Sequence, residues 1–517
     1  MIGMLLLGGC AAPTAVSSVP QLPQAATPAT PVPSTNTPRP LPTNLPPATS
    51  TPVPTSTPLP TATAVPITIA MPPQWETRIR TALADPALAA WAWQVQSDSA
   101  LPATMRLQPG NDGLIIGQEP LALAVPFTTA WEVVSLTEAN EIVQHGHALV
   151  TVLPWSEIDP TQKALRVDGR FPTDPDYPLQ QNWTLTAAPG TEQAAAALAA
   201  VLQAQPSAET LVHLAAVGDL MLDRSLGYYL AQDNLDYPFT HVRDLLATAD
   251  ITVGNLECAL GDSGTPTAKS YTFRAPPQAA AALALAGFDV ITLANNHAGD
   301  YGLDALMQGV DLLHAAGLAT IGAGANETAA HAPHIVTING LTLAFLGYVD
   351  VPVEAIGGFN TASWTATANT PGLAWAEPAQ IERDVTAVAP QVDHVIVVLH
   401  SGYEYVDSPS PPQVAAAHAA IDAGAALVIG HHAHILQGIE YYNGGVIVYG
   451  LGNFAFEIDG PPETAILNVW LDQNGVRQLE LLPAVIQFGG QPRPAEAWEA
   501  PAILQRVYAL TNALNAP

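Results

Sequence analysis

The chain has 517 residues, of which 48% are hydrophobic and only 12% are charged, so it is long enough for two or three folded units with sizeable cores. Its formal net charge of -30 at pH 7 is the opposite of the basic face that nucleic-acid binding requires, and we expect no nucleic-acid partner. An anionic substrate would have to be held by local cations, either metal ions or individual Arg and Lys side chains.

The first residues have features of an export signal. The apolar segment MIGMLLLGGCAAP contains Leu-Gly-Gly-Cys10, which resembles a bacterial lipobox, although no Lys or Arg precedes Cys10. Unless the match is accidental, residues 1–10 are a lipoprotein-type signal and Cys10 carries the lipid. We therefore expect an extracytoplasmic lipoprotein on the outer face of the cytoplasmic membrane. No other stretch reaches the roughly 18 uninterrupted apolar residues of a transmembrane helix.

Two segments of different character follow the signal. Residues 11–70 are almost entirely Pro, Thr, Ala, Ser and Val, which predicts a disordered linker between the anchor and the folded part. Residues 71–205 combine helical patterns, such as TEQAAAALAAVLQAQ, with strand-like runs, such as LALAVPFT, and indicate a smaller mixed α/β domain. No motif in that domain assigns a ligand to it.

Residues 206–490 alternate short apolar runs with helical patterns, which is typical of an α/β sandwich or a doubly wound sheet. LVHLAAVGD, ITVGNLE, DVITLANNH, HVIVVLHSG and ALVIGHHAH are the expected strands. Two Asn-Gly dipeptides between apolar runs predict tight hairpins at residues 339–340 and 443–444. The helical patterns between the runs cover Gln278–Ala286, Leu303–Ala316, Pro378–Ala389 and Gln413–Ala423. Residues 491–517 predict a C-terminal amphipathic helix that packs on the sandwich or on a partner.

All five expected strands end in polar side chains of the kinds that bind metals. In open α/β sheets ligands lie outside the carboxyl ends of the strands, so these groups are expected to meet. Each alone has a simpler explanation as a turn or a helix cap, but together they favour a metal site. Carboxylate, carboxamide and imidazole ligands suit Mn, Fe, Zn or Ni, and two ions could share a bridging carboxylate. The strand-end groups are Asp219, Asn255 with Glu257, Asn295-Asn296-His297, His400, and His431-His432-Ala433-His434.

Six consecutive motifs are similar to one known family. AAVGDLMLDR, GNLECAL, KSYTFRAPP, GFDVITLANNHAGDYG, VVLHSGYEY and VIGHHAHILQGIEYYNGGVIVYGLGNFAFE resemble, in order and spacing, the poly-γ-glutamate capsule synthesis family (CapA/PgsA-like) of the calcineurin-like metallophosphoesterase superfamily. The resemblance covers residues 211–458. It implies a four-layer α/β/β/α sandwich with one or two divalent transition metal ions (Mn, Fe or Zn) at the strand ends.

The resemblance also implies roles for individual residues. Asn296 would bind a metal through its amide oxygen and form the catalytic pair with His297. His297 would be the general acid or the hydrogen-bond donor to a developing oxyanion. Glu257 would be the bridging or second carboxylate. The other implied metal ligands are Asp219, His400, His432 and His434.

Further residues surround this set in the sequence. Lys269 and Arg274 are candidate clamps for an anionic substrate, with solvated loop charges as the alternative. Arg224 would bind substrate or orient Asp219 or Glu257. The candidates for supporting contacts around the ligands are His431, Asp300, Glu404 and Asn255.

Two departures from the wider superfamily and one from the family affect the expected chemistry. Met221 stands where related phosphoesterases have a histidine, and Asn255-Leu256-Glu257 replaces their bridging aspartate segment, so one metal would have fewer ligands. Ser401 stands where the family usually has Trp. These differences leave three hypotheses open: a surface metallohydrolase for a phosphoester or the amide bonds of an anionic polymer, a non-catalytic factor for polymer export or attachment, and a ligand-binding module that uses residues 71–205. Other capsule-synthesis membrane proteins are possible partners.

Overall fold

The computed structural model describes residues 66–98, 101–205, 210–354, 356–457 and 460–516. Cys10 and residues 11–65 of the expected linker lie outside this part. Ordered structure begins before the predicted end of the linker at residue 70, because Ile67–Ala70 form strand β1 with Ile69 fully buried. The apolar ITIA sequence accounts for this, since it can bury side chains that the Pro- and Thr-rich segment lacks. Within the described residues, no helix has both the length and the apolarity needed to cross a membrane.

Residues 66–205 form a mixed α/β region with its own core. Its main sheet has the strand order β2-β1-β3-β9-β4-β6, with β7 beside β4 and a separate pair of β5 and β8. The Ala-rich helix α3 packs its small side chains against α1 and β4, which accounts for the alanines in its sequence. The elements are β1, α1 (Glu76–Leu83), β2 (Trp93–Gln96), β3 (Met105–Pro109), β4 (Leu114–Pro126), β5 (Val133–Val134), α2 (Leu136–His145), β6 (Thr151–Pro154), β7 (Gln162–Ala164), β8 (Arg166–Val167), β9 (Gln180–Ala187) and α3 (Glu192–Ala204).

The first sheet of the following region is mixed, with the order β15-β14-β11-β10-β25-β26-β27 and with β24 beside β10. Its parallel strands are the expected apolar runs, and its antiparallel part comes from the C-terminal segment. The strands are β10 (Val212–Met221), β11 (Ile251–Leu256), β14 (Val290–Thr292), β15 (Ala319–Ile321), β24 (Asn453–Phe456), β25 (Glu463–Asp472), β26 (Gly475–Ile486) and β27 (Pro492–Pro494). The helices along this half are α4 (Arg224–Leu230), α5 (Arg243–Leu246), α6 (Gln278–Ala286) and α7 (Leu303–Ala315), whereas the short α8 (Glu327–Ala330) buries Ala330 in the outer core of the second sheet.

The second sheet has the order β17-β18-β20-β21-β23-β22. Both predicted Asn-Gly hairpins lie in it, one joining β17 to β18 and the other joining β22 to β23. Its elements are β17 (His334–Ile338), β18 (Leu341–Asp350), β20 (His394–Ser401), β21 (Ala425–His431), β22 (Ile439–Tyr442) and β23 (Gly445–Val448), with helices α9 (Pro378–Val388), α10 (Pro411–Asp422) and α11 (Ala500–Leu514). Short strand pairs complete the region: β12 (Ala259–Leu260) with β13 (Arg274–Ala275), and β16 (Ala323–Gly324) with β19 (Gly372–Leu373).

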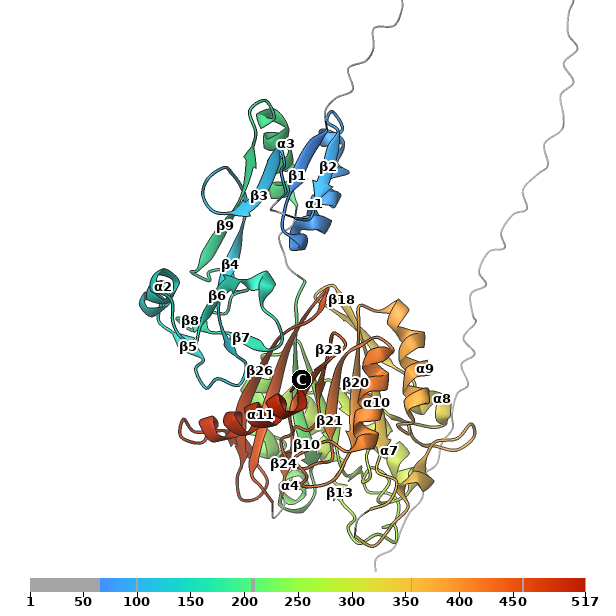
Figure 1. The fold of residues 1–517 in the computed structure, drawn as a ribbon. Coiled ribbons are helices and arrows are strands. Elements are labelled where there is room, and N and C mark those ends of the chain that lie inside the picture. Colours follow the sequence, from blue (N-terminus) through green and yellow to red (C-terminus); the bar gives the residue numbers. More distant parts are fainter. Residues whose placement is uncertain (1–65, 99–100, 206–209, 355, 458–459, 517) are drawn as a thin grey trace, which may run out of the picture. The chain divides into compact units, whose positions relative to one another are not determined.

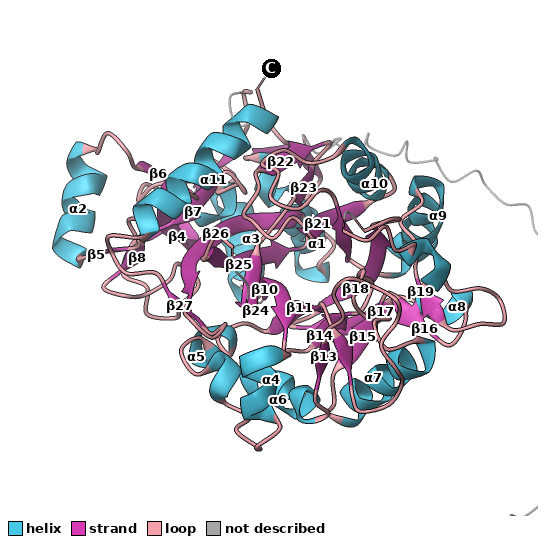
Figure 2. Ribbon diagram, turned by 90° about the horizontal axis from the view of Figure 1, so that it is seen from below, coloured by secondary structure: helices cyan, strands magenta, loops and turns pink. Residues whose placement is uncertain are grey.

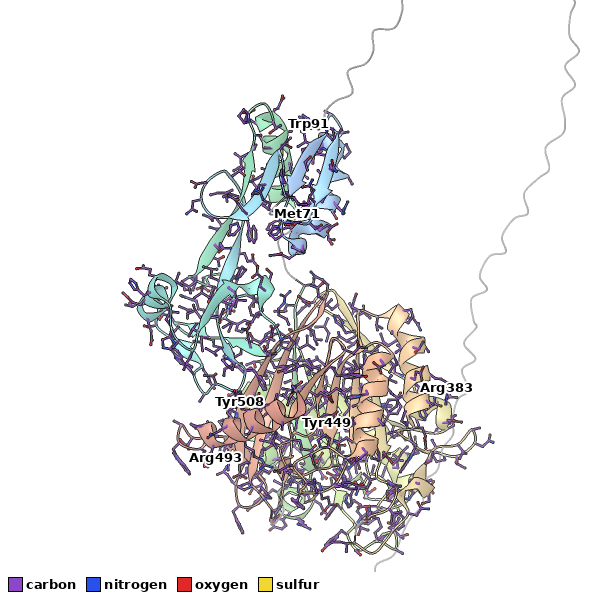
Figure 3. All side chains as sticks on the ribbon, in the orientation of Figure 1. Met71, Trp91, Arg383, Tyr449, Arg493 and Tyr508 are labelled. Atoms are coloured by element: carbon purple, nitrogen blue, oxygen red, sulfur yellow. The ribbon has the colours of Figure 1, made fainter. Side chains whose placement is uncertain are left out.

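The two sheets pack face to face and helices cover both outer faces. One buried cluster joins Leu214 and Val253 of the first sheet to Phe345 and Ile429 of the second, so the inner faces form a shared core. Separate clusters hold α4, α6 and α7 on the first sheet and α9 and α10 on the second (Figures 1 and 2). Tyr449 lies in the interior on the α10 side (Figure 3). The predicted four-layer α/β/β/α sandwich is therefore confirmed.

The C-terminal helix belongs to the sandwich. Ile503, Leu504 and Val507 of α11 are buried in the core between the sheets, and the helix contacts β22 and β26. It covers one end of the layer between the sheets, where apolar side chains would otherwise meet water. Of the two expected positions of this helix, on the sandwich or on a partner, the structure has the first.

Candidate metal centre

The polar strand ends of both sheets converge on one buried site. Asp219 of β10 is in register with Asn255 of the parallel strand β11. In the other sheet His400 of β20 is in register with His431 of β21. Because each strand ends at the same edge of its sheet, four separate chain segments deliver their side chains to one place. All four side chains are buried, and so is Glu257, which follows β11 directly.

Within the described residues, two overlapping groups of side chains have the composition of a metal site. One comprises Glu257, His432 and His434, and the other comprises Asp219, Glu257 and His400. In each group the ligand atoms lie within 4.8 Å of one another. Glu257 belongs to both groups, which is the position that a bridging carboxylate occupies between two ions.

The residues present fit a metal ion. Both carboxylate oxygens of Glu257 and Nδ1 of His432 are buried, and none of them has a hydrogen-bond partner among the described residues. An uncompensated buried carboxylate is costly unless a cation or a proton neutralises it. Carboxylates and imidazoles with no thiolate nearby suit a divalent ion of the Mn, Fe or Zn type. The nearest cationic groups to Glu257 are imidazoles, with Nε2 of His400 at 3.5 Å and Nε2 of His434 at 3.9 Å from Oε1. These groups could therefore hold a metal, and the carboxylate oxygens of Glu257, which accept no hydrogen bond among the described residues, are the strongest sign of it.

Burial and mutual contact set unusual protonation preferences in the site. Burial and the neighbouring Asp219 raise the pKa of Glu257 well above its ordinary value. Burial also disfavours the charge on Asp219, but hydrogen bonds from His431 and His434 outweigh it and hold that pKa well below normal. Burial and His434 lower the pKa of His432 to about 3, whereas the carboxylates of Glu257 and Asp219 overcome burial and raise that of His434 to about 10. Two buried carboxyl groups, Asp219 and Glu257, thus share one site with opposite protonation preferences, and a bound cation would stabilise the ionised form of both.

His431, the third histidine of the HHAH run, serves Asp219. Its Nδ1 lies 2.9 Å from Oδ1 of Asp219, and the backbone N–H of His432 donates to Oδ2 at 3.3 Å. Asn255 donates to Oδ1 from its amide at 2.8 Å and to Nδ1 of His400 at 3.1 Å. His431 and Asn255 therefore contact and orient metal-ligand candidates, and their supporting role in a metal site stays a prediction.

The backbone of the HHAH run is strained at the two histidines expected to bind metal. His432 has φ of 84° and His434 has φ of 55°, a left-handed conformation that residues other than glycine seldom adopt. Such strain costs on the order of 1–3 kcal/mol and persists only where surrounding contacts impose it. Here it turns both imidazoles toward Glu257, since both belong to the same donor group.

The Asn296-His297 pair lies at the edge of the same site. Oδ1 of Asn296 accepts a hydrogen bond from Nε2 of His400 at 2.7 Å, which places the amide oxygen beside the donor groups. Nδ1 of His297 is 2.7 Å from Oδ2 of the fully buried Asp300. That contact fixes the imidazole ring and leaves Nε2 as the nitrogen that can face a substrate. The predicted supporting contact of Asp300 is thus to His297.

Lys269 is enclosed by protein carboxylates. Its side chain is fully buried, and Nζ lies 2.6 Å from Oδ1 of Asp300 and 2.5 Å from the carbonyl oxygen of Asn296. Glu354 is a further ion-pair partner. In this arrangement the ammonium group holds the loop of Asn296 and the orienting Asp300 in place, and the alternative of a solvated loop charge is wrong. A direct role in clamping substrate stays a prediction.

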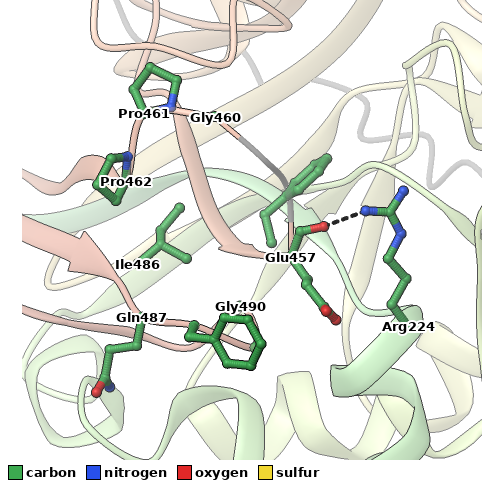
Figure 4. Close-up of a pocket in the computed structure, with 11 residues that line it drawn as sticks. Arg224, Glu457, Gly460, Pro461, Pro462, Ile486, Gln487 and Gly490 are labelled. Atoms are coloured by element: carbon green, nitrogen blue, oxygen red, sulfur yellow. Dashed lines mark hydrogen bonds between the residues drawn. The ribbon is translucent and has the colours of Figure 1, made fainter.

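The two arginines lie apart from the donor groups. Arg224 donates from Nη1 to the carbonyl oxygen of Glu457 at 2.6 Å and lines a separate pocket of about 390 Å³ (Figure 4). No hydrogen bond or ion pair joins Arg224 to Asp219 or Glu257 within the described residues, so the expected orienting contact is not formed. The reason is that Arg224 is the exposed first residue of α4, and its guanidinium group is bound to the backbone of Glu457. Arg274 lies 4.2 Å over the ring of Tyr301. Substrate binding by either arginine stays a prediction.

The remaining sequence positions of interest have clear places. Glu404 lines a cavity beside the site and acts electrostatically on Glu257 and His434. Met221, where related phosphoesterases have histidine, is fully buried in the core beneath α4 and α6. It fills space with apolar volume and adds no ligand, so the reduced ligand count inferred from the sequence holds at this position.

The sequence did not indicate a role for Asn453, and Asn295 was expected among the strand-end groups without a role of its own. Oδ1 of Asn453 lies 2.8 Å from Nδ1 of His434, and the residue is buried at the start of β24. Asn295 donates to Oδ1 of Asn255 at 2.9 Å and accepts the backbone N–H of His297 at 3.0 Å. Both lie in quoted motifs, GNFAFE and ANNH, so a buried asparagine next to a ligand segment was the available signal.

Donors from both sheets of an α/β/β/α sandwich, gathered between the strand ends, define a metallophosphoesterase-type protein. More specifically, the chain belongs to the bacterial capsule synthesis protein PGA_cap family, whose model matches residues 213–458. This confirms the resemblance found in the motifs.

Similar proteins support this assignment. The capsule biosynthesis protein CapA of Bacillus anthracis is 34% identical over 288 residues, which cover 54% of this chain and 68% of that protein. The PGA biosynthesis protein CapA of Bacillus subtilis (strain 168) is 32% identical over 272 residues, covering 52% of this chain and 70% of that protein. A crystal structure of a hypothetical protein from Thermus thermophilus aligns with a TM-score of 0.34 and 14% identity, over 52% of this chain and 98% of that one. The fold assignment therefore depends on the sheet topology and the family match.

Proposed function

We propose that this chain is a cell-surface protein of poly-γ-glutamate or capsule biosynthesis with a metal-dependent hydrolytic site. The names of its relatives support the pathway, since both similar Bacillus proteins are named for capsule or PGA biosynthesis. The observation that carries the hydrolytic part is Glu257, whose buried oxygens accept no hydrogen bond among the described residues and belong to both donor groups. Two ions that share a carboxylate suit hydrolysis at phosphorus or at an acyl centre.

The residues of the chain supply the parts that such a reaction needs. Asp219, Glu257 and the site histidines would hold the ions. When bound, divalent metal supplies a water of lowered pKa and polarises the bond under attack. His297 donates or accepts a proton at Nε2, because its Nδ1 is fixed by Asp300. Asn296 presents its amide oxygen at the edge of the donor set.

The proposed location follows from the amino-terminal sequence. Lipid on Cys10 would tether the protein to the outer face of the cytoplasmic membrane, and residues 11–65 would separate the folded part from it. The substrate is then an anionic polymer or a phosphoester outside the cytoplasm, and other membrane proteins of capsule synthesis are the proposed partners.

A second candidate is a non-catalytic export or attachment factor that binds carboxylates of the polymer through its metal. Met221 supports it, because this buried thioether replaces one histidine ligand and leaves a centre with fewer donors. The hydrolase and the export factor would both bind metal, but only the hydrolase would convert substrate into product.

Turnover of defined substrates separates them. The full chain, reconstituted with Mn, Fe or Zn, is assayed on γ-glutamyl oligomers and on aryl phosphomonoesters and diesters. The proposal expects metal-dependent product that falls by about 10²–10⁴-fold in His297→Ala while metal content is unchanged. Binding of oligomers without any product, with full metal loading, would favour the export factor and contradict hydrolysis.

A further inference from the structure

A cavity of about 620 Å³ opens directly beside the candidate metal centre. Asn296 and His432 form part of its wall, so a molecule in the cavity would reach the metal site. Much of the remaining wall comes from the ends of β18 and β20 and the loops that follow them. These loops bring Asp350, Tyr403 and Glu404 to the cavity.

The charged groups that line this cavity are all acidic. They are Asp350, Glu354 and Glu404, and no Lys or Arg is among the described lining residues. Glu354 is engaged in an ion pair with the buried Lys269, which it shares with Asp300. The side chains of Asp350 and Glu404 have no hydrogen bond or ion pair with any described residue. The cavity wall is therefore acidic, with Asp350 partly buried and Glu404 exposed, and it repels a row of carboxylates and attracts a cation.

A buried hydroxyl group also lacks a partner in the cavity wall. Ser401 is 1% exposed, its Oγ makes no hydrogen bond to a described residue, and it is in register with Asp350 on the neighbouring strand. A buried hydroxyl without a partner loses the hydrogen bonds that it makes to water, so a polar ligand atom at this place would be favoured. Ser401 and Asp350 together offer two acceptors at adjacent strand ends.

The rest of the lining favours an organic cation over a metal ion. Tyr403 and Tyr405 contribute aromatic rings, whose faces attract ammonium groups. Val351, Pro352 and Pro412 make other parts of the wall apolar. A hard metal ion needs about six oxygen ligands close together, and the donor groups found among the described residues do not include Asp350 or Glu404.

We propose that this cavity binds the primary ammonium group of the substrate, and that the substrate end held there is the amino-terminal residue of a γ-glutamyl chain. The assignment of the cavity to substrate rests on the proposed function, whereas its preference for an ammonium group rests on the cavity alone. An amino-terminal glutamyl residue combines an ammonium group for Asp350, Glu404 and Ser401 with a carboxylate for the metal centre. Internal chain segments have only carboxylates, so the site would act on chain ends.

Paired probes test the preference. Binding of a γ-glutamyl trimer with a free amino terminus is compared with that of its N-acetylated form by calorimetry, using the full chain with and without added Mn or Zn. Inorganic phosphate serves as a probe of the metal centre alone. We expect the free trimer to bind about tenfold more tightly, because only it carries the cation that the cavity attracts. Asp350→Asn and Glu404→Gln should each reduce that ratio several-fold, and the exposed Glu382→Gln on α9 should not change it.

Each result has a definite meaning. Equal or tighter binding of the acetylated trimer, or an unchanged ratio in both cavity variants with wild-type metal content and circular dichroism, overturns the inference. If phosphate binds only with metal and the trimers do not differ, the metal centre stands and the ammonium site fails. If the free trimer is preferred in protein that binds no metal, the ammonium site stands and the hydrolytic function fails. Saturation of the cavity by a metal ion would also overturn it.

Discussion

Removing the ammonium group of Lys269 should destabilise the protein strongly. Lys269→Met leaves Asp300, fully buried, and Glu354, with its side chain 10% exposed, as two neighbouring carboxylates without their cation. Breaking a buried ion pair by removing one partner costs about 3–5 kcal/mol. Because Glu354 retains some access to water, we expect the lower half of that range, with Met restoring part of the apolar packing.

The assay is urea-induced unfolding of the full chain in the presence of a chelator, so that metal binding does not contribute to the free energy of unfolding. Arg383→Met is the matched control, because Arg383 is exposed on α9 (Figure 3) and its loss should change the free energy of unfolding by less than about 0.5 kcal/mol. Adding Asp300→Asn to Lys269→Met should recover part of the loss, since it removes one uncompensated charge.

The same variants decide between two roles of Lys269. If Lys269→Met unfolds with the free energy of Arg383→Met, the ammonium group is solvated and the enclosure of Lys269 is refuted. Such a result would favour the substrate clamp. A loss of about 3 kcal/mol that Asp300→Asn partly reverses would instead establish the buried cluster.

Three further predictions concern the site and its frame. Asn453→Ala removes the contact to Nδ1 of His434 and should weaken metal affinity about 10–100-fold in a chelator competition. Unchanged affinity would show that the orientation of the His434 imidazole does not depend on Asn453. In His297→Ala, metal content measured by mass spectrometry should equal that of the wild type, and loss of metal would place this residue among the ligands. Gly218→Ala puts a Cβ 2.1 Å from the carbonyl oxygen of Gly452 and should lower the free energy of unfolding by about 1–3 kcal/mol; a neutral effect would mean that β10 can move away.

The sequence predicted helices and strands well where the spacing of the apolar residues and the length of the segment indicated the same type of element. The helix expected at Gln278–Ala286 matches α6 residue for residue, and the expected strands correspond to β10, β11, β14, β20 and β21. Both Asn-Gly hairpins formed because that dipeptide adopts the left-handed turn without strain. The long antiparallel pair of β25 and β26 was not foreseen. Its pairing with β10 joins segments that are far apart in the sequence, which no local pattern reports.

The sequence indicated the candidate ligands and some supporting residues, such as His431 and Asn255, but not Asn453 or the enclosure of Lys269. Asp219, Glu257 and the histidines follow apolar strands, and topology alone brings such strand ends together. The charged groups around them were harder to place, because whether Lys269 meets solvent or a buried carboxylate depends on loop packing. Asn453 was overlooked for the same reason, since its partner His434 becomes its neighbour only through the close approach of β24 to β10.

The metal content of the purified full chain tests the central claim most directly. After reconstitution with Mn, Fe or Zn, mass spectrometry should find about two equivalents of one metal in the wild type. Glu257→Gln should lose most of both, because Glu257 is the donor that the two groups share. A His432→Ala, His434→Ala double variant should lose at least one equivalent. No specifically bound metal in the wild type, with folding confirmed by circular dichroism, would contradict the account.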